Sequence, residues 1–218
     1  MKELFYFDCN ATYGPHPGKH REARWTLEHL LEDLDLAGIA GALVQHEQGM
    51  HGDPLLANRT LINDIQPHRK RLFPCWAAFP GGHGFPDGRT FARQLKDHDV
   101  RAVRLAPDLF GLPPTESRWG DLRDALVAEG ILVIMTIDRQ CGDFRTIDAM
   151  LRLFQDGNTL LTGHCWHHWQ AVEHLMAEHP RLHIEFSTFQ ANRAVEYFAE
   201  RFGADRCLFG TGLMGKAP

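Results

Sequence analysis

Residues 120–138 read GDLRDALVAEGILVIMTID and contain one complete helix-to-strand unit. Leu122, Ala125 and Leu126 recur at the spacing of one helix face, and a glycine ends the helical pattern. The segment 131–137 that follows is almost entirely apolar, which is typical of a strand buried on both faces of a parallel sheet. We therefore predict an amphipathic helix that leads into a central strand.

The same alternation extends in both directions along the chain and is typical of βα units. Eight strands with near-equal spacing predict a TIM-type (β/α)8 barrel that occupies residues 1–218 as a single domain; an open doubly wound sheet is the alternative. After Gly212 only six residues remain, so the eighth helix is expected to be absent or truncated. Strands are predicted at 4–9, 41–45, 72–79, 100–105, 131–137, 159–162, 182–186 and 207–210, and helices at 24–36, 54–67, 89–97, 120–129, 144–155, 169–178 and 192–202.

The composition is that of an ordinary globular domain. Hydrophobic residues make up 44% of the 218 residues, charged residues 23%, and the formal net charge is −5. The densest basic run, 68–71, closes a predicted helix, where cations favour the negative end of the helix dipole, so no nucleic-acid partner is expected. The chain has no apolar run of about 20 residues and no signal-peptide pattern at its start, so we expect no membrane partner and a cytoplasmic location.

The cysteine pattern indicates a reducing compartment. The cysteines are odd in number and scattered, and none has the CxxC spacing of a metal or redox motif. We expect reduced thiols that mostly serve as packing groups. The five positions are Cys9, Cys75, Cys141, Cys165 and Cys207.

The active-site face of such a barrel lies at the carboxyl ends of its strands and on the loops that follow. The residues selected by this rule are polar and rich in histidine and carboxylates, as hydrolysis or proton transfer requires. We predict catalytic roles for His164, Asp8 and Asp138, and substrate-binding roles for Asn10, Thr12, His46, Arg104 and Glu185.

Several of these residues have an alternative structural role. His164 could act as a general acid or base without a metal, or be a structural histidine. Asp8 could orient a catalytic group, or cap backbone N–H groups of a loop. Arg104 could bind a substrate carboxylate or phosphate through its planar fork, or form an ion pair with Glu185 or Asp138.

Four short phrases resemble the amidohydrolase superfamily, in its amidohydrolase-related branch (family 2). Residues 7–14, FDCNATYG, resemble the strand-one signature Asp-x-His-x-His, and residues 208–212, LFGTG, resemble the strand-eight signature Leu-Phe-Gly-Ser/Thr-Asp. The phrases at 100–105, VRAVRL, and at 160–164, LLTGH, also fit. Because the phrases span nearly the whole chain, the resemblance implies the barrel fold throughout.

The chain departs from that family at most of its metal-ligand positions. Asn10 and Thr12 stand where the family has two histidines, Thr136 holds the strand-five position, and Gly212 replaces the strand-eight aspartate; only His164 is retained. A catalytic zinc normally takes three His, Cys or carboxylate ligands, which neutral oxygens do not replace. We therefore expect no metal or other cofactor.

One dense group of possible ligands leaves an alternative open. A displaced site for zinc or another divalent metal could use His164, Cys165 and His168. Side chains alternate across a strand, so His164 and Cys165 should point in opposite directions, which argues against this site. A shift of one residue in strand register would exchange the two.

We predict an amidohydrolase-like hydrolase that acts on an ester, lactone or related bond of a small carboxylated molecule, with little or no dependence on metal. Lactonases of pyrone dicarboxylates in this superfamily resemble such a case, and related branches decarboxylate small aromatic or muconate acids. One alternative is a catalytically inactive barrel that serves as a binding or assembly subunit. Another is a metal-dependent hydrolase or decarboxylase with a displaced metal site. A homo-oligomer is expected, because a second subunit could cover the flank left open by the missing helix.

Overall fold

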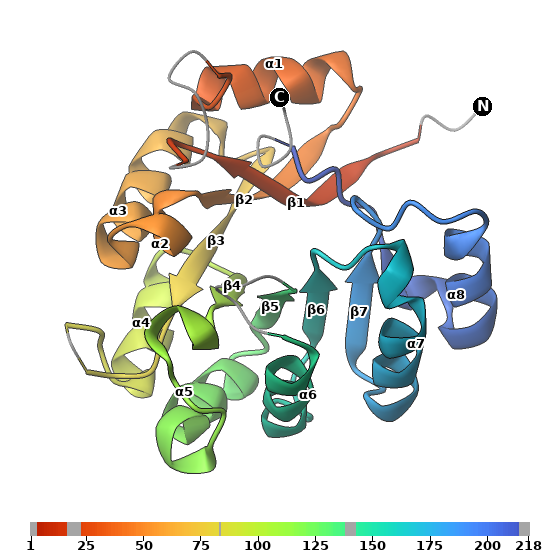
Figure 1. Cartoon of the computed structure of the whole chain (residues 1–218). Helices are drawn as coiled ribbons and strands as arrows, with labels where there is room; N and C mark the ends of the chain where they lie inside the picture. The colour runs from red at the N-terminus through yellow and green to blue at the C-terminus, as the bar shows by residue number, and fades with distance from the viewer. Residues whose placement is uncertain (1–3, 17–22, 83, 138–142, 214–218) are drawn as a thin grey trace. The chain divides into compact units, whose positions relative to one another are not determined.

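The computed structural model describes residues 4–16, 23–82, 84–137 and 143–213. Parallel strands alternate with helices along the chain and follow one another in the order β1 to β8 (Figure 1). The fold is the TIM-type (β/α)8 barrel that the sequence predicted. Its contacts define two compact units: residues 1–77 together with 209–218, and residues 78–208.

The first unit contains three parallel strands with their helices, drawn in red to yellow in Figure 1. Strand pairing joins β1 to β2 and β2 to β3, with Thr12 opposite Gln45 in the first pair. Leu30, Leu34 and Leu61 are buried on the inner faces of the helices, as the 3.6-residue pattern requires. The elements are β1 (Phe7–Tyr13), α1 (Leu27–Leu36), β2 (Gly41–His46), α2 (Gln48–His51), α3 (Pro54–Ile65), the 3₁₀ turn Gln66–His68 and β3 (Leu72–Ala78).

The segment after the last strand lies along β1. The backbone N–H of Cys9 donates to the carbonyl of Phe209 over 2.9 Å, and that of Thr12 donates to the carbonyl of Leu213 over 3.2 Å. These bonds connect residues near the two ends of the chain within the first unit.

The second unit contains the remaining five strands, which pair in sequence order from β4 to β8. Val133, Ile134 and Met135 of β5 are buried, as their apolar run predicted. The strands are β4 (Ala102–Leu105), β5 (Leu132–Thr136), β6 (Thr159–Thr162), β7 (Leu182–Glu185) and β8 (Cys207–Leu208). The helices are α4 (Gly88–Asp97), α5 (Glu116–Ala128), α6 (Phe144–Leu153), α7 (Trp169–Glu178) and α8 (Ala194–Phe202), with 3₁₀ turns at Pro107–Phe110, Trp166–His168 and Ala204–Arg206.

Aspartate caps fix where three of the helices begin. The side chains of Asp53, Asp87 and Asp143 accept hydrogen bonds from backbone N–H groups in the first turns of α3, α4 and α6. Such caps satisfy donors that a helix cannot satisfy internally.

Within the described part of the chain no disulfide forms, and no helix is long and apolar enough to cross a bilayer.

The structure shifts several predicted bounds by a few residues: α1 begins at Leu27, α5 begins at Glu116 and β8 ends at Leu208. Two differences are larger. Strand β1 was predicted at 4–9 but begins at Phe7 and extends to Tyr13, because the polar stretch through Thr12 pairs with β2 while Leu4 is 72% exposed. The short helix α2 after β2 was not predicted. The expected loss of an eighth helix concerns residues 214–218, which lie outside the described ranges.

Candidate functional site

The buried carboxylate of Asp8 connects β1 to the segment after β8. Its Oδ1 accepts the backbone N–H of Asn10 at 2.8 Å and that of Thr211 at 3.0 Å, and its Oδ2 accepts the Thr211 hydroxyl. Asp8 is fully shielded from solvent. These contacts correspond to the loop-capping alternative, and the catalytic role of Asp8 stays a prediction.

Thr12 contacts a carboxylate that follows the neighbouring strand. Its hydroxyl donates to Oε1 of Glu47 at 2.6 Å. Burial alone would raise the pKa of Glu47, but the hydrogen bonds from His51 and Thr12 and the charges of His51 and His16 outweigh it, so the pKa is lowered. Glu47 is therefore an ionised carboxylate at neutral pH.

His46, a predicted substrate-binding residue, is packed at the end of β2. Its ring meets that of Tyr13 edge-on with centroids 5.0 Å apart, and its Nδ1 accepts the backbone N–H of Gln48 at 3.2 Å. Burial lowers the pKa of His46, so a neutral imidazole is favoured. Gly14 fits beside this ring with φ +106°, where a Cβ would come within 2.9 Å of the imidazole.

Arg104 lies buried at the end of β4 in the second unit. Its Nη1 donates to the hydroxyl of Thr136 on β5 and to that of Thr162 on β6, the latter over 3.1 Å. The two threonine hydroxyls are themselves 2.8 Å apart. These two hydroxyls position the guanidinium between neighbouring strands.

His164 follows β6 and has no solvent exposure, whereas the next residue, Cys165, is partly exposed. The imidazole packs against the ring of Phe189 with centroids 5.2 Å apart, and the backbone carbonyl of His164 accepts the Thr188 hydroxyl at 2.6 Å. The register is thus the one in which His164 and not Cys165 is interior. Whether His164 transfers protons stays a prediction.

Of the two remaining predicted carboxylates, the structure describes Glu185 but not Asp138. Glu185 ends β7, is fully buried, and accepts the backbone N–H of Ser187 at 2.7 Å and its hydroxyl at 2.9 Å. Asp138 lies outside the described residues. The predicted set is divided between the units: Asp8, Asn10, Thr12 and His46 belong to the first, and Arg104, His164 and Glu185 to the second.

The ligand positions expected from the resemblance do not suit a divalent cation. Thr12 donates its hydroxyl proton to Glu47. The position held by Thr136 receives a guanidinium N–H from Arg104, and that positive charge would repel a cation bound there. The residues at these positions therefore do not fit the metal centre of the family.

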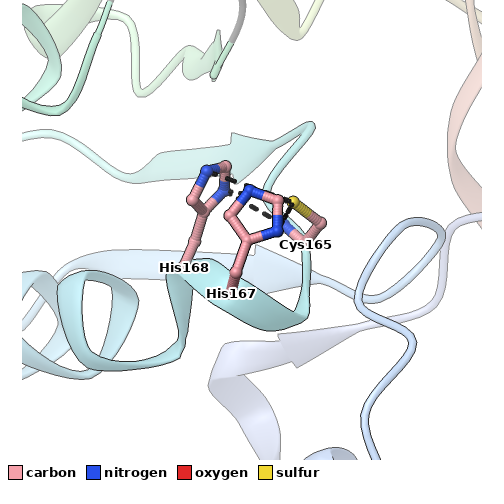
Figure 2. A group of neighbouring side chains, drawn as sticks. All are labelled: Cys165, His167 and His168. Atoms are coloured by element: carbon pink, nitrogen blue, oxygen red, sulfur yellow. Dashed lines mark hydrogen bonds between the residues drawn. The ribbon is translucent and has the colours of Figure 1, made fainter.

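A first group of possible ligands forms around Cys165 (Figure 2). Its Sγ lies 3.2 and 3.4 Å from the ring nitrogens of His167 and 3.5 Å from Nδ1 of His168. However, that Nδ1 accepts the backbone N–H of Cys165, and His167 is exposed. Burial first, and the neighbouring His167 second, lower the pKa of His168. The alternative site predicted with His164 is not among the ligand groups formed by the described residues.

A second group was missed by the sequence reasoning and consists of His16, Glu47 and His51. One ligand atom from each lies within 4.8 Å of the others. The available signal was the spacing of Glu47 and His51, four residues apart after a predicted strand, where helical geometry brings side chains together. His16 could not be assigned to this group from spacing, since it follows a different strand.

Comparison with known proteins places this chain in a family. A family model described as amidohydrolase, of the amidohydrolase-related family 2, matches residues 22–217. The chain belongs to the amidohydrolase family. The resemblance inferred from the four short phrases is therefore confirmed, although no curated protein matches the chain.

Several solved structures have a fold similar to that of this amidohydrolase-family chain. An uncharacterised TIM-barrel protein from Bordetella bronchiseptica is 17% identical, with a TM-score of 0.68 over 96% of this chain and 86% of that one. A 4-oxalomesaconate hydratase from Rhodopseudomonas palustris is 14% identical (TM-score 0.66, 97% and 82%). A 5-carboxyvanillate decarboxylase from Sphingomonas paucimobilis is 11% identical (TM-score 0.67, 99% and 90%). At such identities the likeness shows the fold alone.

Proposed function

We propose that this amidohydrolase-family chain is an enzyme that hydrolyses an ester, a lactone or a related bond in a small carboxylated molecule. The observation that carries the proposal is the buried guanidinium of Arg104, held by the hydroxyls of Thr136 and Thr162 at the ends of neighbouring strands. A fixed planar fork recognises a carboxylate through two parallel hydrogen bonds. The hydratase and the decarboxylase of similar fold are both named for carboxylated substrates.

The proposed chemistry assigns proton transfer to His164. Its imidazole takes a proton from water, the hydroxide adds to the acyl carbon, and the carbon–oxygen bond to the leaving group breaks. The leaving oxygen then receives the proton from the imidazolium, which restores the neutral histidine. In this scheme Arg104 positions the substrate through a carboxylate remote from the bond that breaks.

The test compares the replacement of Arg104, which lies in β4, with the replacement of Arg101, which immediately precedes β4. A panel of lactones and esters, each with and without a second carboxylate, is offered to wild type, Arg104→Met and Arg101→Met. Arg101 is the control because its side chain is 73% exposed and pairs with Asp99. We expect Arg104→Met to raise KM about tenfold or more for carboxylated substrates only, since a charge-assisted pair contributes about 1.5–3 kcal/mol. An equal loss on neutral esters would contradict the anchoring role.

A second candidate, a binding or assembly subunit without catalysis, is favoured by the environment of His164. His164 has no solvent exposure, and Phe189 is buried against its imidazole. In addition, exposed aromatic side chains gather in the first unit: Phe7 packs on Phe73, and Tyr6 on Phe209. A chain that is inactive on the whole panel, and that light scattering finds to be an oligomer, would support this candidate.

A further inference from the structure

The side chains of His16, Glu47 and His51 converge from two loops of the first unit. His16 follows β1, Glu47 immediately precedes the short helix α2, and His51 ends that helix. Oε2 of Glu47 lies 3.5 Å from Nε2 of His51, and the imidazole rings of His16 and His51 have centroids 4.4 Å apart. Ligand atoms of a tetrahedral zinc ion are about 3.4 Å apart, given metal–ligand distances of about 2.0–2.2 Å.

Hydrogen bonds join the segment that carries His16 to the segment that carries Glu47 and His51. The position of the three side chains relative to one another is therefore also fixed by the backbone around them. The backbone N–H of Glu47 donates to the carbonyl of Tyr13 at 2.8 Å. The side-chain amide of Gln48 donates to the carbonyl of Pro15, next to His16, at 2.6 Å. A site that is arranged before the metal arrives loses less entropy on binding it.

Thr12 supplies the outer-shell contact that metal-binding carboxylates usually have. Its hydroxyl donates to Oε1 of Glu47, while Oε2 of the same carboxylate lies on the side of His51. Such contacts orient a ligand and raise its affinity for the metal. The side chains of Glu47 and His51 are only 11% and 16% exposed, so the group is shielded yet still reachable from solvent.

We propose that His16, Glu47 and His51 bind a Zn²⁺ ion, at a position that the metal-ligand pattern of the family does not use. Two imidazoles and one carboxylate are a donor set that suits zinc and leave one tetrahedral position for water or another ligand. The group around Cys165 is the weaker candidate, because its His168 already accepts a backbone N–H through Nδ1. This site goes beyond the hydrolysis proposed above, which does not require a metal.

The test measures zinc binding directly. The chain is purified without a polyhistidine tag, stripped with EDTA, and titrated with Zn²⁺ against a chromophoric chelator, with bound metal counted by mass spectrometry. We expect one zinc per chain in wild type. His51→Ala and His16→Ala should weaken binding by more than about a hundredfold, and Thr12→Val by about ten- to a hundredfold, the range found for outer-shell contacts.

Two controls distinguish zinc bound at this site from zinc bound at Cys165 and from loss of folding. Cys165→Ser removes the central ligand of the other group and should leave zinc affinity unchanged. Melting temperatures in EDTA show that each variant is folded, and His16→Ala serves where His51→Ala does not fold. Wild type that binds no zinc at micromolar free Zn²⁺, equal affinity in the histidine variants, or loss of zinc in Cys165→Ser instead would each overturn the proposal.

Discussion

Replacing Asp8 tests whether this carboxylate is a structural cap. In Asp8→Ala, the backbone N–H groups of Asn10 and Thr211 and the Thr211 hydroxyl lose their acceptor at a site with no solvent exposure. In Asp8→Asn, Oδ1 can still accept both N–H groups, and the new amide can donate to the Thr211 hydroxyl oxygen, while the hydroxyl proton loses its acceptor. Asp8→Asn therefore keeps the shape of the side chain and most of its hydrogen bonds, whereas Asp8→Ala removes both.

The expected magnitudes follow from these contacts. A hydrogen bond to a charged group contributes about 1.5–3 kcal/mol, and each buried donor left without an acceptor costs about 1–3 kcal/mol. Because water can enter the space vacated by the side chain, we expect a loss of about 3–5 kcal/mol for Asp8→Ala. Asp8→Asn should lose less than about 1.5 kcal/mol. Typical domains have only about 5–15 kcal/mol of stability, so the first loss is large.

Urea unfolding followed by circular dichroism measures both losses. With a slope near about 2–3 kcal/mol per molar, the Asp8→Ala midpoint should fall by about 1–2 M. The reasoning is refuted if that midpoint falls by less than about 0.4 M, or if Asp8→Asn falls as far as Asp8→Ala. The second result would mean that the negative charge, and not the acceptor geometry, stabilises this region.

Two further predictions concern the second unit. Gly163 has φ +77°, and a Cβ there would come within 2.8 Å of Thr136, whereas the site of Gly130, at φ +64°, is open. Gly163→Ala should therefore destabilise the chain more than Gly130→Ala does. Thermal unfolding of the two variants measures this difference. Burial would raise the pKa of Asp148, but hydrogen bonds from His179 and Arg152 outweigh burial, so the pKa is lowered. The ionised carboxylate therefore stabilises the folded chain above the unfolded pKa near 4, and this stabilisation is lost as the pH falls through the lower folded value. The stability gap between wild type and Asp148→Asn should therefore narrow from neutral pH towards about pH 3, and a gap that widens would contradict this assignment.

The sequence by itself determined the fold class and most element positions, since these depend on local periodicity. The apolar run at 131–137 predicted buried β5, and β6 and α7 were predicted with the bounds that the structure has. Strand β1 was misplaced because its polar residues Asn10 and Thr12 conceal the strand, which only its pairing with β2 defines. The family resemblance was also available from short phrases, and the absence of the usual metal ligands stays a prediction from the same phrases.

Only the tertiary structure decided which functional side chains meet. Thr12 and Glu47 are 35 residues apart, Arg104 and Thr162 are 58 apart, and His16 approaches His51 across two loops. Such contacts depend on the register between neighbouring strands and on the turns that follow them, and a shift of one residue would turn each side chain to the opposite face. Residue types along the chain therefore predicted which groups are available for chemistry, whereas strand register decided which of them are close enough to act together.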